Sequence, residues 1–196
     1  MVGGDRLFNW VYGLKMIQPK YSKLGLEKGI VRLVTYTADW KCYFEREKDE
    51  LQQALGSNVM DIQHVGSTSI SGMIAKPIID IAIAVNDFEE SKTCIPLIEC
   101  LGYVYRGEFG MPHRHYFVKG DPRLFHIHMC EITSTTWKSL IVFRDCLRRN
   151  SDIAKEYAAL KQQLALKYPQ DREAYLEGKA VFIENVLSKC KIELGD

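Results

Sequence analysis

Apolar side chains recur at helical spacing in the segment that follows Asp39. They fall on one face of a helix, with charged residues on the other, at Trp40, Tyr43, Phe44, Leu51 and Leu55. The pattern predicts a helix that ends at Gly56, a residue suited to the C-cap. The run VRLVTY before it (31–36) predicts a short strand. Glycine and proline interrupt residues 1–23, so we expect an N-terminal extension there.

Short β-branched and aromatic runs predict five strands further along the chain. These strands cover residues 59–66, 76–85, 103–108, 114–120 and 124–131. The turn GDPR at 120–123 predicts that the last two strands pair as an antiparallel hairpin. Between the second and third strands, Asp87 can cap a helix over 87–100 in which Pro96 is an irregularity.

The last third of the chain has helical patterns only. They predict helices over 135–149, 151–167 and 171–189, with Ser151 as an N-cap and Pro169 as a break. We therefore expect an α+β fold, in which helices flank a mixed or antiparallel sheet and a helical C-terminal third follows. No internal repeat or low-complexity linker divides the chain, which indicates one domain over 24–196 after the extension.

Composition and charge limit the function classes. The chain has 196 residues, of which 46% are hydrophobic and 26% charged, as is usual for globular proteins. A net charge of +1 does not favour general nucleic-acid binding. No apolar run is long enough for a membrane span, and no secretory signal pattern is present. The cysteines are scattered without a C-x-x-C pair, so we expect reduced thiols and a cytoplasmic location.

A polar segment, HVGSTSISG, follows the first strand of the predicted sheet. Gly66 lets the backbone turn tightly, and the turn offers N–H and hydroxyl donors to an anion at Ser67, Thr68 and Ser69. Lys76 can add a positive charge. These residues are candidates for binding the phosphate of a nucleotide. The alternative is a Ser/Gly-rich hairpin loop without a ligand.

Asp80 lies inside the apolar run IIDIAIAV. An isolated carboxylate in an apolar strand needs a partner, a metal ion or an exposed strand face. Next to a phosphate-binding loop, Asp80 can bind a divalent cation that bridges to phosphate oxygens, which makes it the candidate catalytic residue. The alternative is a polar residue that is simply hydrogen-bonded within the fold.

Basic residues at two further places are candidate phosphate ligands. Arg114, His115 and Lys119 follow one another in a predicted strand and can line the same cleft, or they form a solvated basic edge. Lys161 and Lys179 each follow a tyrosine by four residues and so share a helical face with it. Such lysines either face the substrate or cover apolar neighbours with their stems.

Several blocks of this sequence together resemble the GrpB family. They are VRLVTYTADW, HVGSTSISGMIAKPIIDI, HIHM, FRDCLRRN, EYAALKQQLA and DREAYLEGKAVFIENVL, in order between Leu24 and Leu187. The resemblance implies a nucleotidyltransferase-like fold of the DNA polymerase beta type. In that superfamily a Gly-Ser turn precedes a strand with two acidic residues one apart. Gly66, Ser67 and Asp80 match this pattern, but Ala82 stands at the second acidic position.

The departure at Ala82 puts the usual two-metal site in doubt, because two carboxylates normally share the two metals. The strand HIHMCE offers a substitute, since His126 and His128 point to one face. If that strand lies beside Asp80, the three side chains can bind one divalent metal, with Mg, Mn or Zn as candidates. Alternatively the two histidines form a half-exposed polar face.

The resemblance implies a metal-dependent transferase that moves a nucleotidyl or phosphoryl group to a small acceptor. One alternative is a non-catalytic module that binds a nucleotide or coenzyme A precursor, because GrpB-like domains also occur fused to dephospho-CoA kinases. Another is a hydrolase in which a metal on Asp80, His126 and His128 activates water. The expected partner is a phosphate-bearing small molecule, and we expect no association with a membrane. Whether the chain is an enzyme, its substrate and its oligomeric state stay open.

Overall fold

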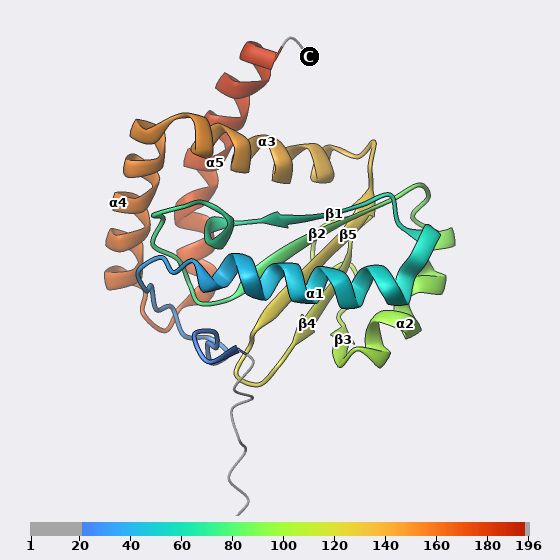
Figure 1. Cartoon of the computed structure of the whole chain (residues 1–196). Helices are drawn as coiled ribbons and strands as arrows, with labels where there is room; N and C mark the ends of the chain where they lie inside the picture. The colour runs from blue at the N-terminus through green and yellow to red at the C-terminus, as the bar shows by residue number, and fades with distance from the viewer. Residues whose placement is uncertain (1–20, 195–196) are drawn as a thin grey trace, which may run out of the picture.

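A mixed five-stranded sheet forms the centre of the molecule, in the order β1-β2-β5-β4-β3 (Figure 1). The structure, a computed structural model, describes residues 21–194, with side chains through Cys190. The strands are β1 (Asp61–Val65), β2 (Ile79–Val85), β3 (Tyr103–Tyr105), β4 (His115–Lys119) and β5 (Phe125–Glu131). Among the strands of the described residues, only β2 and β5 pair in parallel, and β4 and β5 form the predicted antiparallel hairpin. The predicted α+β class is confirmed.

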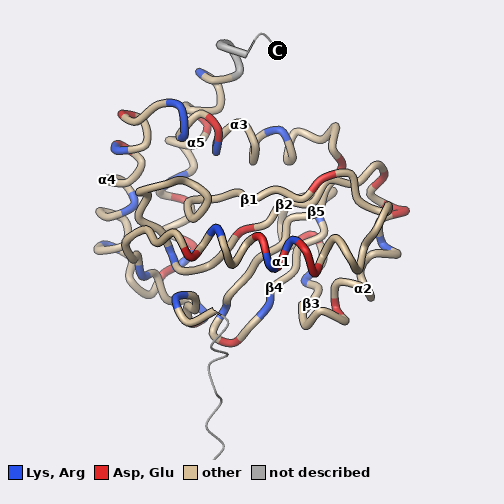
Figure 2. The backbone as a smooth tube through the Cα atoms, viewed as in Figure 1, with Lys and Arg blue, Asp and Glu red and all other residues tan. Residues whose placement is uncertain are grey.

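Helices cover both faces of this sheet (Figure 1). One face packs against α1 (Asp39–Leu55) and α2 (Ile95–Cys100), and the other against the first of the three C-terminal helices. These are α3 (Thr135–Arg149), α4 (Ser151–Lys167) and α5 (Arg172–Leu194). Basic and acidic residues are interspersed along α1, as Figure 2 shows. Within residues 21–194, no helix is long and apolar enough to cross a membrane.

Strand alternation assigns each face of β2 a different role. Ile79, Ile81 and Ile83 point into the main core beneath α1. Asp80 and Ala82 point to the opposite face, where Ala82 packs in a small apolar cluster that includes Trp137 of α3. Asp80 therefore lies on the face that the C-terminal helices cover. The sheet places this carboxylate in the space between the strands and those helices.

Three local predictions differ from the structure. Residues 31–36 form no strand, since they contribute only an isolated bridge between Val34 and Ala75. The helix expected over 87–100 is a 3-10 segment, Glu90–Cys94, followed by the short α2, because Pro96 has no N–H and is accommodated in the first turn of a helix. The N-cap of α4 is Asn150, whose side chain accepts from two backbone N–H groups, and not Ser151.

The cysteines also differ from the expectation of reduced thiols. Cys146 of α3 and Cys190 of α5 form a disulfide, although 44 residues separate them. Packing of the two helices brings the Cα atoms to 6.4 Å, within the range for such a bond, which a scattered sequence pattern cannot indicate. The other described cysteines are free.

The expected N-terminal extension lies mostly outside the described residues. Of the segment 1–23, residues 1–20 are not described. Tyr21 is 2% exposed and belongs to the main core, and its hydroxyl donates to Glu47 of α1 at 2.7 Å. The end of the segment thus packs against the domain. The boundary at residue 23 stays a prediction.

Candidate functional site

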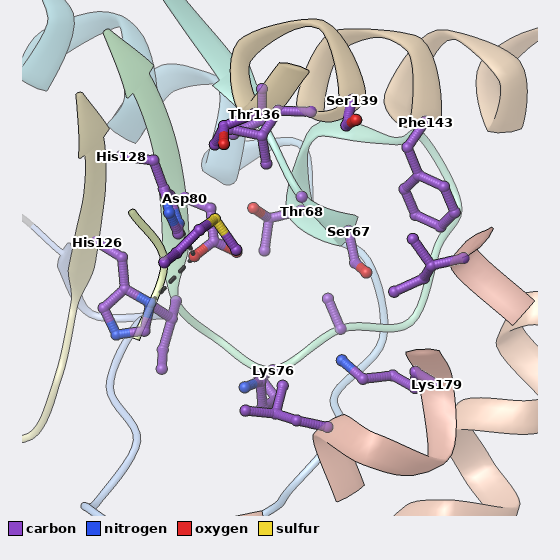
Figure 3. Close-up of a pocket in the computed structure, with 18 of the residues that line it drawn as sticks. Ser67, Thr68, Lys76, Asp80, His126, His128, Thr136, Ser139, Phe143 and Lys179 are labelled. Atoms are coloured by element: carbon purple, nitrogen blue, oxygen red, sulfur yellow. Dashed lines mark hydrogen bonds and ion pairs between the residues drawn. The ribbon is translucent and has the colours of Figure 1, made fainter. Parts of the chain in front are cut away.

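A pocket of about 740 Å³ lies between the sheet and the C-terminal helices. Asp80, His126 and His128 line one end, and Ser67 and Lys179 lie across from them (Figure 3). Most predicted site residues line this one pocket: Gly66, Ser67, Thr68, Lys76, Asp80, Arg114, His126, His128, Lys161 and Lys179. The exceptions are Ser69, His115 and Lys119.

The Gly-Ser turn forms one wall of the pocket. Gly66 has a φ of 68°, and a Cβ atom built there would lie 2.5 Å from Oδ2 of Asp80. Only glycine therefore lets the turn approach the carboxylate this closely. Ser67 begins a 3-10 turn, and Oγ of Ser69 donates to the Gly66 carbonyl at 2.6 Å. Ser69 thus closes the turn and does not face the pocket.

Asp80 interacts with both predicted histidines. The parallel pairing of β2 with β5 sets Asp80 opposite His126 and Ala82 opposite His128. Oδ1 of Asp80 lies 3.0 Å from Nδ1 of His126 and 3.8 Å from Nε2 of His128. Burial alone would raise the pKa of Asp80, but the hydrogen bond from His126 and the nearby imidazole of His128 outweigh it, and the pKa falls well below its ordinary value. Asp80 is therefore ionised.

His126 is neutral beside this carboxylate. Its burial lowers the pKa of the imidazole, although Asp80 acts in the opposite direction. A neutral ring that donates its Nδ1 proton to Asp80 carries a lone pair on Nε2. Among the described residues, Nε2 is buried without a hydrogen-bond partner. The Asp80 carboxylate thus fixes the tautomer of the buried His126 imidazole.

The residues present do not fit the two-metal site of the superfamily. Ala82 has no oxygen ligand, and its methyl group is fully buried against the cluster around Trp137. The donor types of Asp80, His126 and His128 suit a single transition-metal ion. Within the described residues, however, no three His, Cys, Asp or Glu side chains stand at the spacing that holds an ion. Metal binding stays a prediction.

Three lysines converge on the pocket from different elements. Nζ of Lys161, on α4, donates to Oγ of Ser67 at 3.0 Å and also to the carbonyl of Ile74. Nζ of Lys179, on α5, lies 4.5 Å from the centroid of the Tyr175 ring, and Nζ of Lys76 lies 5.7 Å from it. The tyrosine four residues before each helical lysine thus lies beneath its ammonium group.

Burial disfavours the charge on all three lysines. It lowers the pKa of Lys76 to about 8 and that of Lys161 to about 7, with Lys76 adding repulsion at Lys161. The pKa of Lys179 also falls to about 7, through burial and the neighbouring Lys76 and Lys161. Asp80 is the one acidic side chain among the described residues that line the pocket. The basic groups that line the pocket therefore outnumber its one carboxylate, Asp80.

The basic side chains of β4 and of the residue before it point to different faces of the sheet. Arg114 reaches the pocket, where Nη1 lies 3.3 Å from Nδ1 of His128. His115 and Lys119 point to the opposite face, because neighbouring strand residues alternate. His115 stacks on Phe88, with ring centroids 4.1 Å apart, and Lys119 forms an ion pair with Glu47 of α1. The structure does not bring these two residues together with Arg114 in one cleft.

Some pocket residues were not identified from the sequence. Tyr116 lies beside Arg114 and both histidines, and its ring centroid is 5.5 Å from that of His126 and 5.4 Å from that of His128. Phe109 and Met111, in the loop before β4, line the pocket although they are exposed. For Tyr116, alternation with Arg114 along the strand was an available signal. Phe109 and Met111 belong to no periodic pattern, so the sequence offered no signal for them.

The chain is similar in sequence to several known proteins. Residues 30–189 match the family described as GrpB protein. The YqkA protein of Bacillus subtilis, of the group UPF0157, is 38% identical over 82% of this chain, and the match spans 47% of YqkA. The glutamate-rich protein GrpB of Alkalihalophilus pseudofirmus is 36% identical over 85% of this chain and 99% of its own length.

A solved structure agrees with the sequence matches. The crystal structure of the conserved protein GrpB from Enterococcus faecalis superposes with a TM-score of 0.78, at 34% identity, over 84% of this chain and 100% of that one. The matched region contains the whole pocket wall from the Gly-Ser turn to Lys179. The chain belongs to the GrpB family.

Proposed function

We propose that this chain binds a phosphate-bearing small molecule, such as a nucleotide or a coenzyme A precursor, with the phosphate against Ser67, Lys161 and Lys179. The observation that carries the proposal is the burial of these lysines around one pocket. Lys161 is 1% exposed and Lys179 is 9% exposed. Burying an ammonium group without an anion costs several kcal/mol, so a fold that keeps such groups together favours an anionic ligand.

A bound phosphate would reverse the electrostatic cost. Its negative charge would favour the charged form of Lys161 and Lys179 and raise their pKa values towards the ordinary range. The backbone N–H groups of the turn and Oγ of Ser67 would add donors from the other side. Asp80 lies across the pocket from Lys179 and would face the end of the phosphate chain that this lysine does not contact (Figure 3).

One relative supports coenzyme A precursors among the candidate ligands. A protein named dephospho-CoA kinase from Mycolicibacterium paratuberculosis is 26% identical over 76% of this chain, and the match spans 43% of that protein. Its name concerns a substrate with phosphate groups and an adenine ring. Dephospho-CoA therefore belongs in the set of compounds to be tested.

A second candidate function is group transfer or hydrolysis with one metal ion at Asp80, His126 and His128. The specific observation in its favour is that β2 and β5 place these three side chains beside one another. A divalent ion held there would supply Lewis acidity next to a bound phosphate. The residues of this chain would orient the ligand, and His126 would give up its hydrogen bond to Asp80 in order to bind the ion through Nδ1.

Calorimetric titration of the full chain tests the binding proposal. Pyrophosphate, ADP and dephospho-CoA are titrated into the wild type and into Lys161→Met and Lys179→Met. Loss of one charged hydrogen bond should weaken binding about tenfold to hundredfold in each variant. Lys155→Met is the control, because Lys155 lies on the same helix with its side chain 76% exposed. Equal affinities in wild type and variants, or no binding by the wild type, would contradict the proposal.

Turnover separates the two candidates. The same ligands are incubated with the protein and a panel of divalent metals, with Asp80→Asn as the comparison. Release of phosphate, pyrophosphate or nucleoside diphosphate that depends on both metal and Asp80 would support catalysis. Tight binding without any product would leave a binding function.

A further inference from the structure

Exposed apolar side chains gather at one rim of the pocket. Phe109 is 54% exposed and Met111 is 41% exposed, and both line the pocket from the loop between β3 and β4. Single exposed apolar residues are common on protein surfaces. A pair on one short loop at the mouth of a ligand pocket indicates a contact surface.

The loop that carries them is held in a fixed shape. Phe109 has a φ of 48° and His113 a φ of 58°, a backbone region that side chains other than glycine rarely adopt. Nη2 of Arg114 donates to the carbonyls of Glu108 and Phe109, at 3.1 and 3.0 Å. The N–H of His113 donates to Oε1 of Glu108 at 2.9 Å. These bonds offset the backbone strain and keep the Phe109 ring in place.

The Phe109 ring continues a series of rings that begins at the Asp80 site. It stacks on Tyr116 at a centroid distance of 5.0 Å and an interplanar angle of 20°. The Tyr116 ring lies 5.4 Å from that of His128, and the Arg114 guanidinium lies 4.9 Å from the Tyr116 centroid. One face of Phe109 is thus covered by Tyr116. With half of its area still exposed, the ring can take a further planar group.

The rim formed by Phe109 and Met111 and the Gly-Ser turn lie on opposite sides of Asp80. The turn joins β1 to β2, whereas the Phe109 loop joins β3 to β4, and β5 separates β2 from β4. A ligand that reached both would extend across the pocket from a polar, cationic end to an aromatic end. Phosphate esters of nucleosides have this two-ended character.

We propose that the ligand of this pocket carries a planar ring that stacks on Phe109, with Met111 beside it, while its phosphate occupies the lysine end. This rests on the proposed phosphate site. The class of ligand is then a nucleoside phosphate or a conjugate of one, such as dephospho-CoA. Phosphorylated compounds without a planar aromatic ring, such as sugar phosphates, would gain no stacking contact from the rim. Arg114 is a positioning residue that fixes the loop.

Paired titrations of the full chain, all with Mg²⁺ present, test this inference. ADP carries the ring and pyrophosphate lacks it. Phe109→Ala should weaken ADP binding about 5-fold to 150-fold, the range for loss of one stacking contact, and leave pyrophosphate binding unchanged. Phe109→Trp keeps a ring and should retain ADP affinity. Met60→Ala, another exposed apolar residue (56%) away from the pocket, should change neither.

The outcomes against the inference are distinct from those against the phosphate site. Equal effects of Phe109→Ala on ADP and pyrophosphate, or no effect on either, would overturn the ring contact and leave the phosphate site standing. Tighter, Phe109-dependent binding of an alkyl phosphate than of ADP would also overturn it, in favour of an apolar tail. If the wild type bound neither ADP nor pyrophosphate, the proposed function would be overturned, and this inference with it.

Discussion

Replacement of Lys161 by methionine should stabilise the protein at neutral pH and destabilise it at high pH. Burial lowers the pKa of Lys161 from 10.5 to about 7. At about 1.36 kcal/mol for each pH unit between these values, the wild type at pH 7 carries a cost of about 4 kcal/mol. The side chain is 1% exposed, so solvent screening does not reduce this figure. Methionine removes the cost with a side chain of similar length.

The hydrogen bonds of Lys161 act in the opposite direction. Its contacts with Ser67 Oγ and the Ile74 carbonyl contribute about 1 kcal/mol each, and the variant loses both. Lys161→Met should therefore be about 2 kcal/mol more stable than the wild type at pH 7. Between pH 7 and 10.5 the unfolded chain binds one more proton at this lysine than the folded chain. The wild type thus gains stability as the pH rises, and the order reverses near pH 9, where the remaining cost of about 2 kcal/mol equals the contribution of the two hydrogen bonds.

Urea unfolding at several pH values from 7 to 10, followed by tryptophan fluorescence, measures the difference. The predicted signature is a stability difference that changes by about 1.4 kcal/mol for each pH unit. Lys155→Met, on the exposed side of the same helix, should show no such slope. A difference between Lys161→Met and the wild type that stays constant with pH would refute the reasoning, because Lys161 would then not be a buried amine that titrates in this range.

Three further predictions concern other parts of the structure. Gly66→Ala should displace Asp80, since the new methyl group would lie 2.5 Å from Oδ2, and should destabilise the protein by about 1–3 kcal/mol in urea unfolding. Ala82→Asp should also destabilise the protein, by about 3 kcal/mol, because an unpaired carboxylate replaces a fully buried methyl group. Recovery of the lost stability on addition of Mg²⁺ would instead reveal a two-metal site. Thiol titration of the denatured, unreduced chain should find four reactive thiols, with Cys146 and Cys190 unreactive until a reductant is added; six thiols before reduction would contradict the disulfide.

Much of the fold followed from local patterns. The amphipathic spacing that begins at Trp40 placed α1 within one residue of its observed start, and the observed bounds of α3 are the predicted ones. These elements have long periodic patterns and clear ends, such as Gly56 at the end of α1. The run 31–36 has strand-forming residues but no neighbouring strand along its length, so tertiary context overrode its propensity.

The site was predictable where covalent spacing determines geometry. The alternation of β5 placed His126 and His128 on one face, and the i,i+4 spacing placed Tyr175 beneath Lys179. Strand alternation also separates His115 and Lys119 from Arg114, although the sequence alone did not show which face was the pocket. That required the order of the strands and the packing of the helices.

Other features depended on contacts that no sequence spacing determines. The disulfide joins residues on two helices whose crossing is a result of tertiary packing. The Phe109 loop has its shape because Arg114 binds its carbonyls, and that residue was expected to bind phosphate. The burial of Lys161 and Lys179 around one pocket likewise became visible only with α4 and α5 in place.

The most direct test of the central claim is a crystal structure of the chain with pyrophosphate bound. The phosphate site predicts density for the ligand within hydrogen-bond distance of Lys161 and Lys179 Nζ and of Ser67, between the Gly-Ser turn and the C-terminal helices. Pyrophosphate bound elsewhere on the surface, with these three side chains unchanged and without contact to it, would contradict the claim that the buried lysines form an anion site.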